Sequence, residues 1–118
     1  MNASGNSDSS ANVALPNFMY ADLSGISNLG KGYNFKNTGI VEMNLPRDVD
    51  ISDGAFMNCN SLRKIEFNKY QTSVVNIGAQ AFYNVNLACK AYMHKTLVDD
   101  STFILQRTAT QNIPKIAY

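Results

Sequence analysis

The side chains best suited to catalysis are two cysteines, Cys59 and Cys89, and one histidine, His94. A cysteine nucleophile needs a base within hydrogen-bonding reach and a further group that orients that base. His94 is the only histidine, and it follows Met93 at the end of a predicted strand, where a surface or capping role is expected. Because no nucleophile, base and orienting group can be assembled, we predict no catalytic residue and a protein that is not an enzyme.

Five aspartates form two clusters that could attract a cation. Asp48, Asp50 and Asp53 precede a predicted turn, and Asp99 and Asp100 come later in the chain. Calcium requires six or more oxygen ligands from a closely wound loop, and neither spacing matches such a loop. Turn capping and solvation are therefore the favoured roles. The glycines also lack the Lys-Ser/Thr pair that completes a phosphate-binding loop, so neither a metal nor a cofactor is predicted.

The composition excludes two further classes of function. A net charge of +1 gives no electrostatic footprint for nucleic acid. No apolar stretch approaches the roughly 20 residues needed to cross a bilayer. The chain has 45% apolar residues, enough for a stable core, and its many asparagines and serines suit a fold rich in turns. We expect no nucleic acid partner and no membrane span.

A repeat of 26 residues must position these side chains. The cassette Ala55-Phe56-Met57-Asn58 returns as Ala81-Phe82-Tyr83-Asn84, and Ile51 and Ile77 precede the two copies at the same offset. A period of this size is typical of a solenoid, in which each repeat adds one layer to a stack. Stacked repeats usually serve as extended binding surfaces, which shifts the functional expectation away from catalysis.

Aligning Phe56 with Phe82 places the apolar line Leu62, Ile65 and Phe67 on Ala88, Ala91 and Met93. A slip of one residue would match Leu87 to Leu62 but would bury Lys90. An unpaired buried ammonium costs more than the exchange of leucine for alanine, so we reject the slip.

The segment from Lys64 to Phe67 alternates polar and apolar residues, as a short strand does. Ile65 and Phe67 should point inward, and Lys64 and Glu66 outward. Equivalent strands should stack in parallel along the solenoid.

A third, less regular copy lies upstream, where Phe35-Lys36-Asn37 precedes Ile40, Met43 and Leu45. Its phenylalanine stands 21 residues before Phe56. The predicted structural core comprises Phe35, Ile40, Phe56, Leu62, Ile65, Phe67, Ile77, Phe82 and Ala91.

Asn37, Asn58 and Asn84 each stand two residues after a repeat phenylalanine. A carboxamide there can hydrogen-bond turn backbone that no strand satisfies. A stacked row of asparagines would tie the layers together; otherwise they are simply exposed turn residues.

The two cysteines fall at different phases of the repeat. Cys59 falls on Val85 and should be a small buried filler, whereas Cys89 falls on Arg63, outside the apolar line, and could be an exposed thiol. The different phases argue against a disulfide between them.

The run from Ile51 to Phe67, followed by the run from Val74 to Asn84, resembles the BspA-type leucine-rich repeat of bacterial surface proteins. The shared features are the alanine-phenylalanine pair, the asparagine-cysteine pair and a leucine-x-x-isoleucine strand, and the resemblance covers residues 33–93. It implies a mainly β, short, curved leucine-rich-repeat solenoid, with parallel strands on one face and turns on the other. It also implies an exported or cell-surface protein that binds a protein, matrix or host component.

We expect residues 1–12 to be a disordered lead or junction and residues 13–118 to form one domain. Its repeats should span about 30–50, 51–76 and 77–95, with a C-terminal cap at 96–118. Both ends of the stack need irregular caps, because the outer layers expose apolar faces and unpaired edges. Residues 102–108 are strand-like and could close the stack, 113–116 should form an extended edge, and 15–29 should cover the first repeat. An exposed end could also favour a dimer.

The outward side chains of the strands are the best binding candidates. They are Glu42, Asn44, Lys64, Glu66, Lys90 and Tyr92, predicted to form two short rows on the concave face. We predict a protein-interaction module that binds a protein or host-surface ligand through this face. The alternatives are a merely solvated sheet, a structural spacer or capping domain of a larger exported protein and, third, carbohydrate binding.

Overall fold

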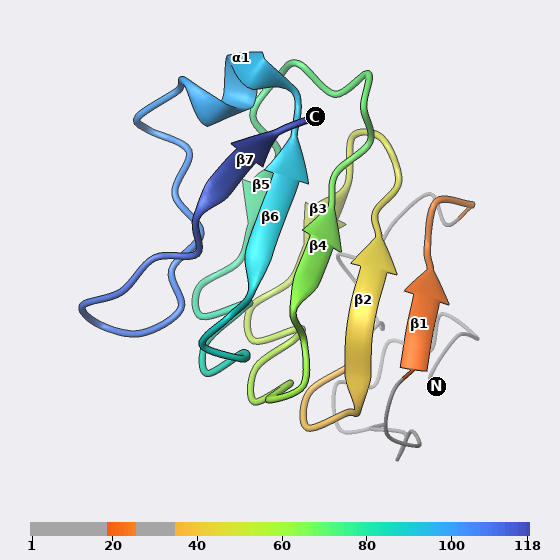
Figure 1. Cartoon of the computed structure of the whole chain (residues 1–118), viewed down its shortest axis with the longest axis vertical. Helices are drawn as coiled ribbons and strands as arrows, with labels where there is room; N and C mark the ends of the chain where they lie inside the picture. Colours follow the sequence, from red (N-terminus) through yellow and green to blue (C-terminus); the bar gives the residue numbers. More distant parts are fainter. Residues whose placement is uncertain (1–18, 26–34) are drawn as a thin grey trace.

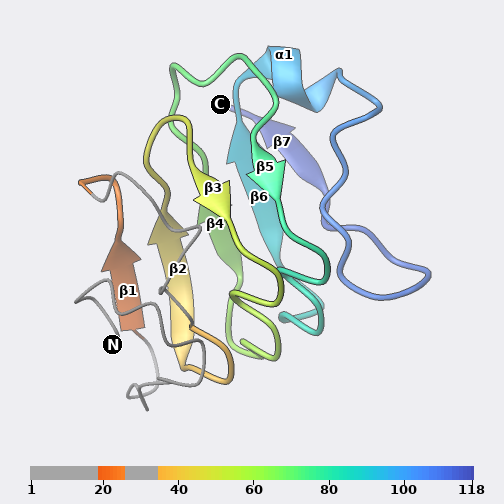
Figure 2. The same cartoon turned by 180° about the vertical axis from the view of Figure 1, so that it is seen from behind.

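The computed structural model of the chain describes residues 19–25 and 35–118. A five-stranded sheet in the order β1-β2-β4-β6-β7 forms one wall, and a two-stranded sheet, β3-β5, lies behind it (Figures 1 and 2). The larger sheet contains β1 (Met19–Asp22), β2 (Ile40–Asn44), β4 (Lys64–Glu66), β6 (Lys90–Met93) and β7 (Lys115–Ala117). The smaller sheet contains β3 (Asp50–Ile51) and β5 (Asn76–Ile77).

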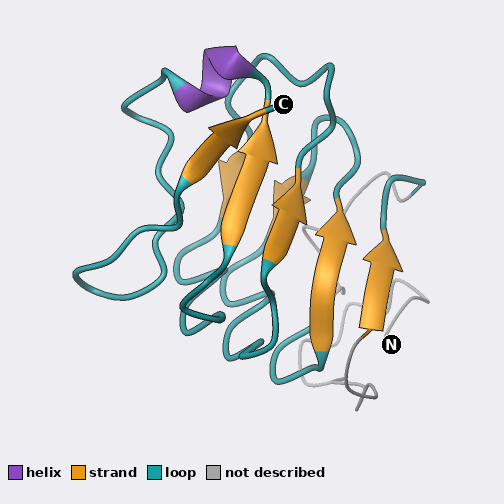
Figure 3. Ribbon diagram, viewed as in Figure 1, coloured by secondary structure: helices purple, strands orange, loops and turns teal. Residues whose placement is uncertain are grey.

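Every strand pair in the two sheets is parallel, because each coil returns to the start of the next strand through the turns. Met43 pairs with Ile65, and Ile65 pairs with Ala91. This is the register that the repeat alignment predicts. The chain is therefore a mainly β solenoid of about four turns, with loops covering most of its remaining surface (Figure 3), and the predicted fold class is confirmed.

A column of phenylalanine rings runs through the solenoid. The ring centroids of Phe35 and Phe56 lie 5.1 Å apart, and those of Phe56 and Phe82 lie 5.4 Å apart. The planes of both pairs are nearly parallel, at 2° and 7°. Each ring fills the space between its own layer and the next, so the layers share one apolar core. Of the residues assigned to the core from the sequence, all are buried except Ile77, which is half-buried.

A second ladder joins the turns. The backbone N–H of Phe56 donates to the carbonyl of Ala81 at 2.8 Å, and that of Asn58 donates to Tyr83 at 2.8 Å. Phe35 and Asn37 make the same bonds one layer earlier. Asn37, Asn58 and Asn84 all have left-handed backbone, with φ between 60° and 63°, a conformation that asparagine tolerates better than most residues.

The predictions that Cys89 could be an exposed thiol and that Ala88 lies in the core are wrong. Cys89 is 1% exposed, whereas Ala88, which the alignment placed in the core, is exposed. Asn86 explains the shift, because its side-chain oxygen accepts from the N–H of Ala88 and its carbonyl accepts from Cys89. This turn displaces the apolar position by one residue, and the register returns at Lys90. Leu87 is exposed, whereas the rejected slip would have placed it in the core. Both cysteines are buried and free.

The C-terminal cap also differs from expectation. Residues 102–108 form no strand. They contact the stack through the buried side chains of Phe103 and Leu105 and through Arg107, which accepts from the N–H of Asn84 and donates to the carbonyl of Val85. A helix of four residues, α1 (Lys95–Val98), precedes this segment, and β7 closes the sheet. Its first residue, Lys115, stands in the inward row opposite Ala91.

The inward ammonium of Lys115 finds three backbone partners in the cap. It donates to the carbonyls of Leu97, Asp100 and Phe103 at 3.0, 2.7 and 2.8 Å. The apolar alternation that identifies a closing strand is therefore absent here, because a lysine fills the core-facing position. The expected extended edge at 113–116 overlaps β7.

The other edge of the sheet is β1, which pairs with β2. The expected lead at 1–12 and most of the expected cap at 15–29 lie outside the described residues.

Candidate functional site

The outer face of the five-stranded sheet carries the six residues predicted to bind a partner. The strand register aligns Glu42 with Lys64 and Lys64 with Lys90. It also aligns Asn44 with Glu66 and Glu66 with Tyr92. These six residues form two rows across the sheet, because period-two alternation turns them away from the core residues between them. We call the two rows the sheet face.

The same register extends the sheet face beyond the predicted residues. Tyr20 and Asp22 on β1 stand opposite Glu42 and Asn44. Ile116 on β7 stands opposite Tyr92. These three residues could not be assigned from the repeat pattern, because β1 and β7 lie outside the regular copies and their spacing to the repeat is irregular. Tyr20 is 65% exposed, so a second aromatic lies at the edge opposite β7.

Lys64 organises the centre of the sheet face. Its ammonium lies 2.9 Å from a carboxylate oxygen of Glu66 and 5.3 Å from the centroid of the Tyr92 ring. The hydrogen bond to Glu66 raises the pKa of Lys64, with smaller contributions from the charges of Glu66 and Glu42. Lys64 therefore stays charged, and its contact with the ring orients Tyr92 over β4. Both members of the ion pair remain about one-third exposed, so the pair contributes little to folding.

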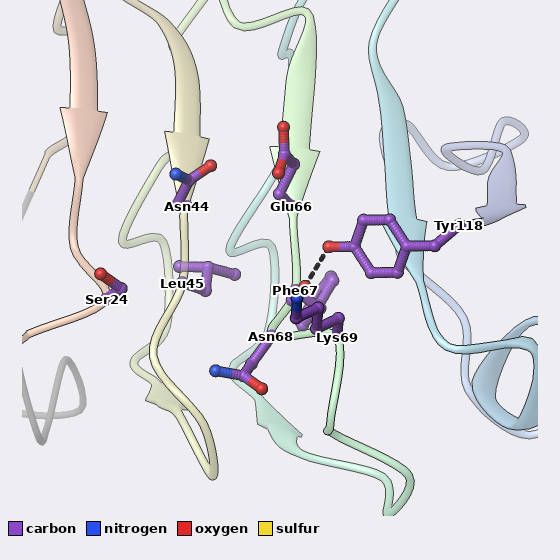
Figure 4. Close-up of a pocket in the computed structure, with 8 residues that line it drawn as sticks. All are labelled: Ser24, Asn44, Leu45, Glu66, Phe67, Asn68, Lys69 and Tyr118. Atoms are coloured by element: carbon purple, nitrogen blue, oxygen red, sulfur yellow. Dashed lines mark hydrogen bonds between the residues drawn. The ribbon is translucent and has the colours of Figure 1, made fainter.

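A pocket of about 300 Å³ opens at the carboxyl ends of β2 and β4, where the second row of the sheet face ends (Figure 4). Its lining combines the buried apolar side chains Leu45 and Phe67 with polar groups around them. The polar lining consists of Ser24, Asn44, Glu66, Asn68, Lys69 and Tyr118. Parallel strands bring all their carboxyl ends to one edge, which is why residues distant in sequence meet here.

Tyr118 crosses the end of the sheet and forms one side of this pocket (Figure 4). Its hydroxyl donates to the carbonyl of Phe67. Burial, followed by the nearby charge of Glu66, raises the pKa of Tyr118 to about 12. The hydroxyl therefore remains a donor at neutral pH and keeps the ring in place.

The remaining candidates from the sequence have structural surroundings. His94 is the N-cap of α1, and its Nδ1 accepts from the N–H of Thr96 at 3.1 Å. Asp53 accepts from the N–H of Ala79 in the next coil at 2.7 Å. Within residues 19–25 and 35–118, no group of three or more histidine, cysteine or acidic side chains could hold a metal ion.

The three turn asparagines lie along one line of the turns. The carboxamide of Asn84 donates to that of Asn58 at 3.2 Å, which links two layers. The bonds to turn carbonyls come from their backbone N–H groups instead.

A comparison with known protein families identifies the family to which this solenoid belongs. The family described as "BspA type leucine rich repeat region (6 copies)" matches residues 27–115. The match covers most of the chain, and the protein belongs to this family. No curated protein and no solved structure matched the chain. The family's repeats are typical of non-enzymatic protein-interaction modules and of proteins associated with bacterial surfaces. None of the helical structure in the described part of the chain is long and apolar enough to cross a membrane.

Proposed function

We propose that the sheet face is the surface with which this protein binds a protein or matrix partner outside the bacterial cell. The observation that carries the proposal is the separation of two sets of side chains. The core residues hold the fold, whereas the two rows on the sheet face contribute little to it. Cross-strand pairs of this kind are worth only about 0.2 to 1 kcal/mol each. Their side chains can therefore suit a partner without loss of the fold.

Each end of the sheet face has its own chemistry. The acidic side chains Asp22 and Glu42 lie on β1 and β2, and Lys90 lies on β6. Between them, Lys64 and Glu66 form an ion pair on β4. A partner with the reverse order of charges would be oriented by this gradient. Tyr92 is the aromatic anchor of the surface, since tyrosine buries a large area at low entropic cost.

The pocket at the end of the second row suits one apolar side chain of that partner. Leu45 and Phe67 provide an apolar lining, and Asn44 and Glu66 belong both to this lining and to the sheet face. A residue of the partner that enters the pocket would be continuous with contacts along the row. Interfaces of this kind draw most of their affinity from a few anchors in desolvated pockets.

The test is binding of the double variant Lys64→Ala/Tyr92→Ala to purified extracellular-matrix glycoproteins, measured by surface plasmon resonance. The matched control is Lys95→Ala/Tyr70→Ala, which removes the same residue types from exposed positions outside the two rows. We expect the sheet-face variant to weaken binding at least tenfold, about 1.4 kcal/mol, and the control to bind like the wild type. Equal affinity of wild type and sheet-face variant would remove this face from the binding surface.

The same panel separates an interaction module from a structural spacer. A spacer should bind no glycoprotein in the panel, with or without the substitutions. Carbohydrate binding gains no support from the second aromatic, because β2 and β4 lie between Tyr20 on β1 and Tyr92 on β6. The two rings therefore form no common stacking platform.

A further inference from the structure

The two rows of the sheet face complement each other on every strand. The first row consists of Tyr20, Glu42, Lys64 and Lys90, and Pro114 continues it one residue before β7. The second row consists of Asp22, Asn44, Glu66, Tyr92 and Ile116. From β1 to β6, each strand therefore holds two side chains, two residues apart, whose types suit a hydrogen bond, an ion pair or a cation-aromatic contact. At β7 both side chains are apolar.

One of these pairs is already formed within the chain. The ammonium of Lys64 lies 2.9 Å from a carboxylate oxygen of Glu66, and the two side chains are 38% and 33% exposed. Each group can therefore accept a second contact from above the sheet. Lys90 is also exposed, and its ammonium has no ion pair or hydrogen bond within residues 19–25 and 35–118. The sheet face thus holds charge that its own strands do not neutralise.

A second copy of the chain supplies the missing complement. If two sheet faces meet about a two-fold axis that crosses the strands midway between the rows, the first row of each copy lies over the second row of the other. Lys64 then faces Glu66 of the second copy, and the reverse contact forms by symmetry. Lys90 faces the ring of Tyr92 in the same reciprocal way. The four central charges alternate in sign, so the internal ion pairs and the new ones are both favourable.

The outer positions agree with the same axis. The remaining matches are Tyr20 with Asp22, Glu42 with Asn44, and Pro114 with Ile116. In the first two, a hydroxyl or a carboxamide can donate to a carboxylate, and the third is an apolar contact. No two like charges are directly opposed on any of the five strands.

The other face-to-face arrangement is repulsive at its centre. A two-fold axis along β4 would place Lys64 over Lys64 of the second copy, and Glu66 over Glu66. Like charges that oppose each other directly are destabilising. The chemistry of the rows therefore selects the axis that crosses the strands. Figure 1 views the sheet from this face, and no other helix or strand of the described chain lies over β2 or β4.

We propose that two copies of this chain associate through their sheet faces about this axis. The inference rests on the proposed function, because it takes the sheet face as a binding surface and names a second copy as one occupant. Five strands about 4.8 Å apart and about four residues long cover a flat area of only roughly 300 Å². Stable interfaces bury about 800 Å² on each partner, so this dimer is weak and exchanges with the monomer. The dimer covers Tyr92, and the monomer is the form that binds another partner.

Sedimentation equilibrium of the full chain tests the proposal. The wild type should dimerise with a dissociation constant on the order of 0.1 mM, as expected for a small interface. Lys64→Glu and Glu66→Lys should each weaken self-association at least about tenfold, because each opposes like charges at the centre of the dimer. An equimolar mixture of these two variants should dimerise at least as tightly as the wild type, since an acidic copy then faces a basic one.

Two sets of variants serve as controls. Lys95→Glu and Asp99→Lys change the net charge by the same amounts at an exposed ion pair outside the two rows. Each should dimerise like the wild type, and their mixture should associate no more tightly. The double variant Lys64→Glu/Glu66→Lys should restore the dimer without a change in net charge, which also shows that the substitutions leave the fold intact.

A wild type that stays monomeric up to about 1 mM would overturn the proposal. So would a mixture of the two sheet-face variants that associates no more than the mixture of the controls. The glycoprotein test is run at low concentration, where the chain is monomeric, so the two results are independent. A chain that binds a glycoprotein but does not dimerise would remove only the dimer, and a dimer that binds no glycoprotein would remove only the proposed partner.

Discussion

Burial determines the chemistry of Cys89. The side chain is 1% exposed, and this burial raises its pKa to about 12, against a smaller opposing effect of the charge on Arg107. A thiol in this state stays protonated at neutral pH and is a poor nucleophile. Cys59 is also buried, its pKa is raised by burial, and its thiol donates to the carbonyl of Phe35 at 3.0 Å. Both cysteines therefore act as packing residues.

The buried thiol predicts a loss of stability at alkaline pH. The pKa of Cys89 is about 12 in the folded protein and near 9 when the chain is unfolded, so only the unfolded state releases the proton between these values. The contribution of the protonated thiol is complete below pH 9 and is lost as the pH rises toward 12. A difference of about three pH units corresponds to about 4 kcal/mol. The free energy of unfolding, measured with urea between pH 8 and about 11.5, should fall in this way for the wild type. For Cys89→Ala it should fall less over the same range. Parallel curves for the two proteins would contradict the assigned burial.

At the scale of the elements, the 26-residue period predicted β4 and β6 and their register. The reason is that Ile65 and its equivalents must all face one core, which leaves a single alignment without a buried lysine. The same pattern could not predict the elements of the C-terminal cap. β7 presents Lys115 inward, and α1 has only four residues, so neither shows the apolar pattern on which sequence interpretation depends. The six sheet-face residues could be chosen from alternation alone, whereas Tyr20 and Ile116 required the pairing of the edge strands.

Close contact between coils predicts a severe effect of Gly78→Ala. A Cβ at Gly78 would lie 2.3 Å from the backbone nitrogen of Asp53 and 2.4 Å from the backbone carbon of Ser52. The backbone of one coil would have to move, which we expect to cost at least about 2 kcal/mol in the free energy of unfolding. The matched control is Gly25→Ala, because no atom of residues 19–25 and 35–118 lies within 4 Å of a Cβ there. Urea unfolding should place this control within about 0.5 kcal/mol of the wild type. Equal stability of the two variants would mean that the coils are farther apart than described.

The cap should depend on the ammonium of Lys115. Lys115→Met keeps the length of the side chain but leaves the carbonyls of Leu97, Asp100 and Phe103 without their donor. Hydrogen bonds to charged groups contribute about 1.5 to 3 kcal/mol, so residues 95–113 should open more often than in the wild type. Limited proteolysis should cut this segment faster. Lys95→Met, which removes an exposed ion pair with Asp99, should be cut at the wild-type rate. Similar rates for both variants would show that the ammonium does not hold the cap.

For the whole molecule, the stack of rings that holds the fold and the sheet face, our proposed binding surface, use different side chains. Phe35, Phe56 and Phe82 lie in one column, and each touches the layers beside it. The two rows on the sheet face lie on the other side of the strands, in contact with solvent. A repeat protein built in this way can change its recognition surface while its core residues stay the same.

The most direct test of this division is the free energy of unfolding, measured with urea, for Phe56→Ala and for Lys64→Ala/Tyr92→Ala. Phe56 is fully buried between two rings, so its truncation should cost about 3 to 5 kcal/mol. The sheet-face double variant should lose no more than about 1 kcal/mol, because an exposed ion pair and a cation-aromatic contact are weak. A sheet-face variant that is destabilised as much as Phe56→Ala would contradict the account.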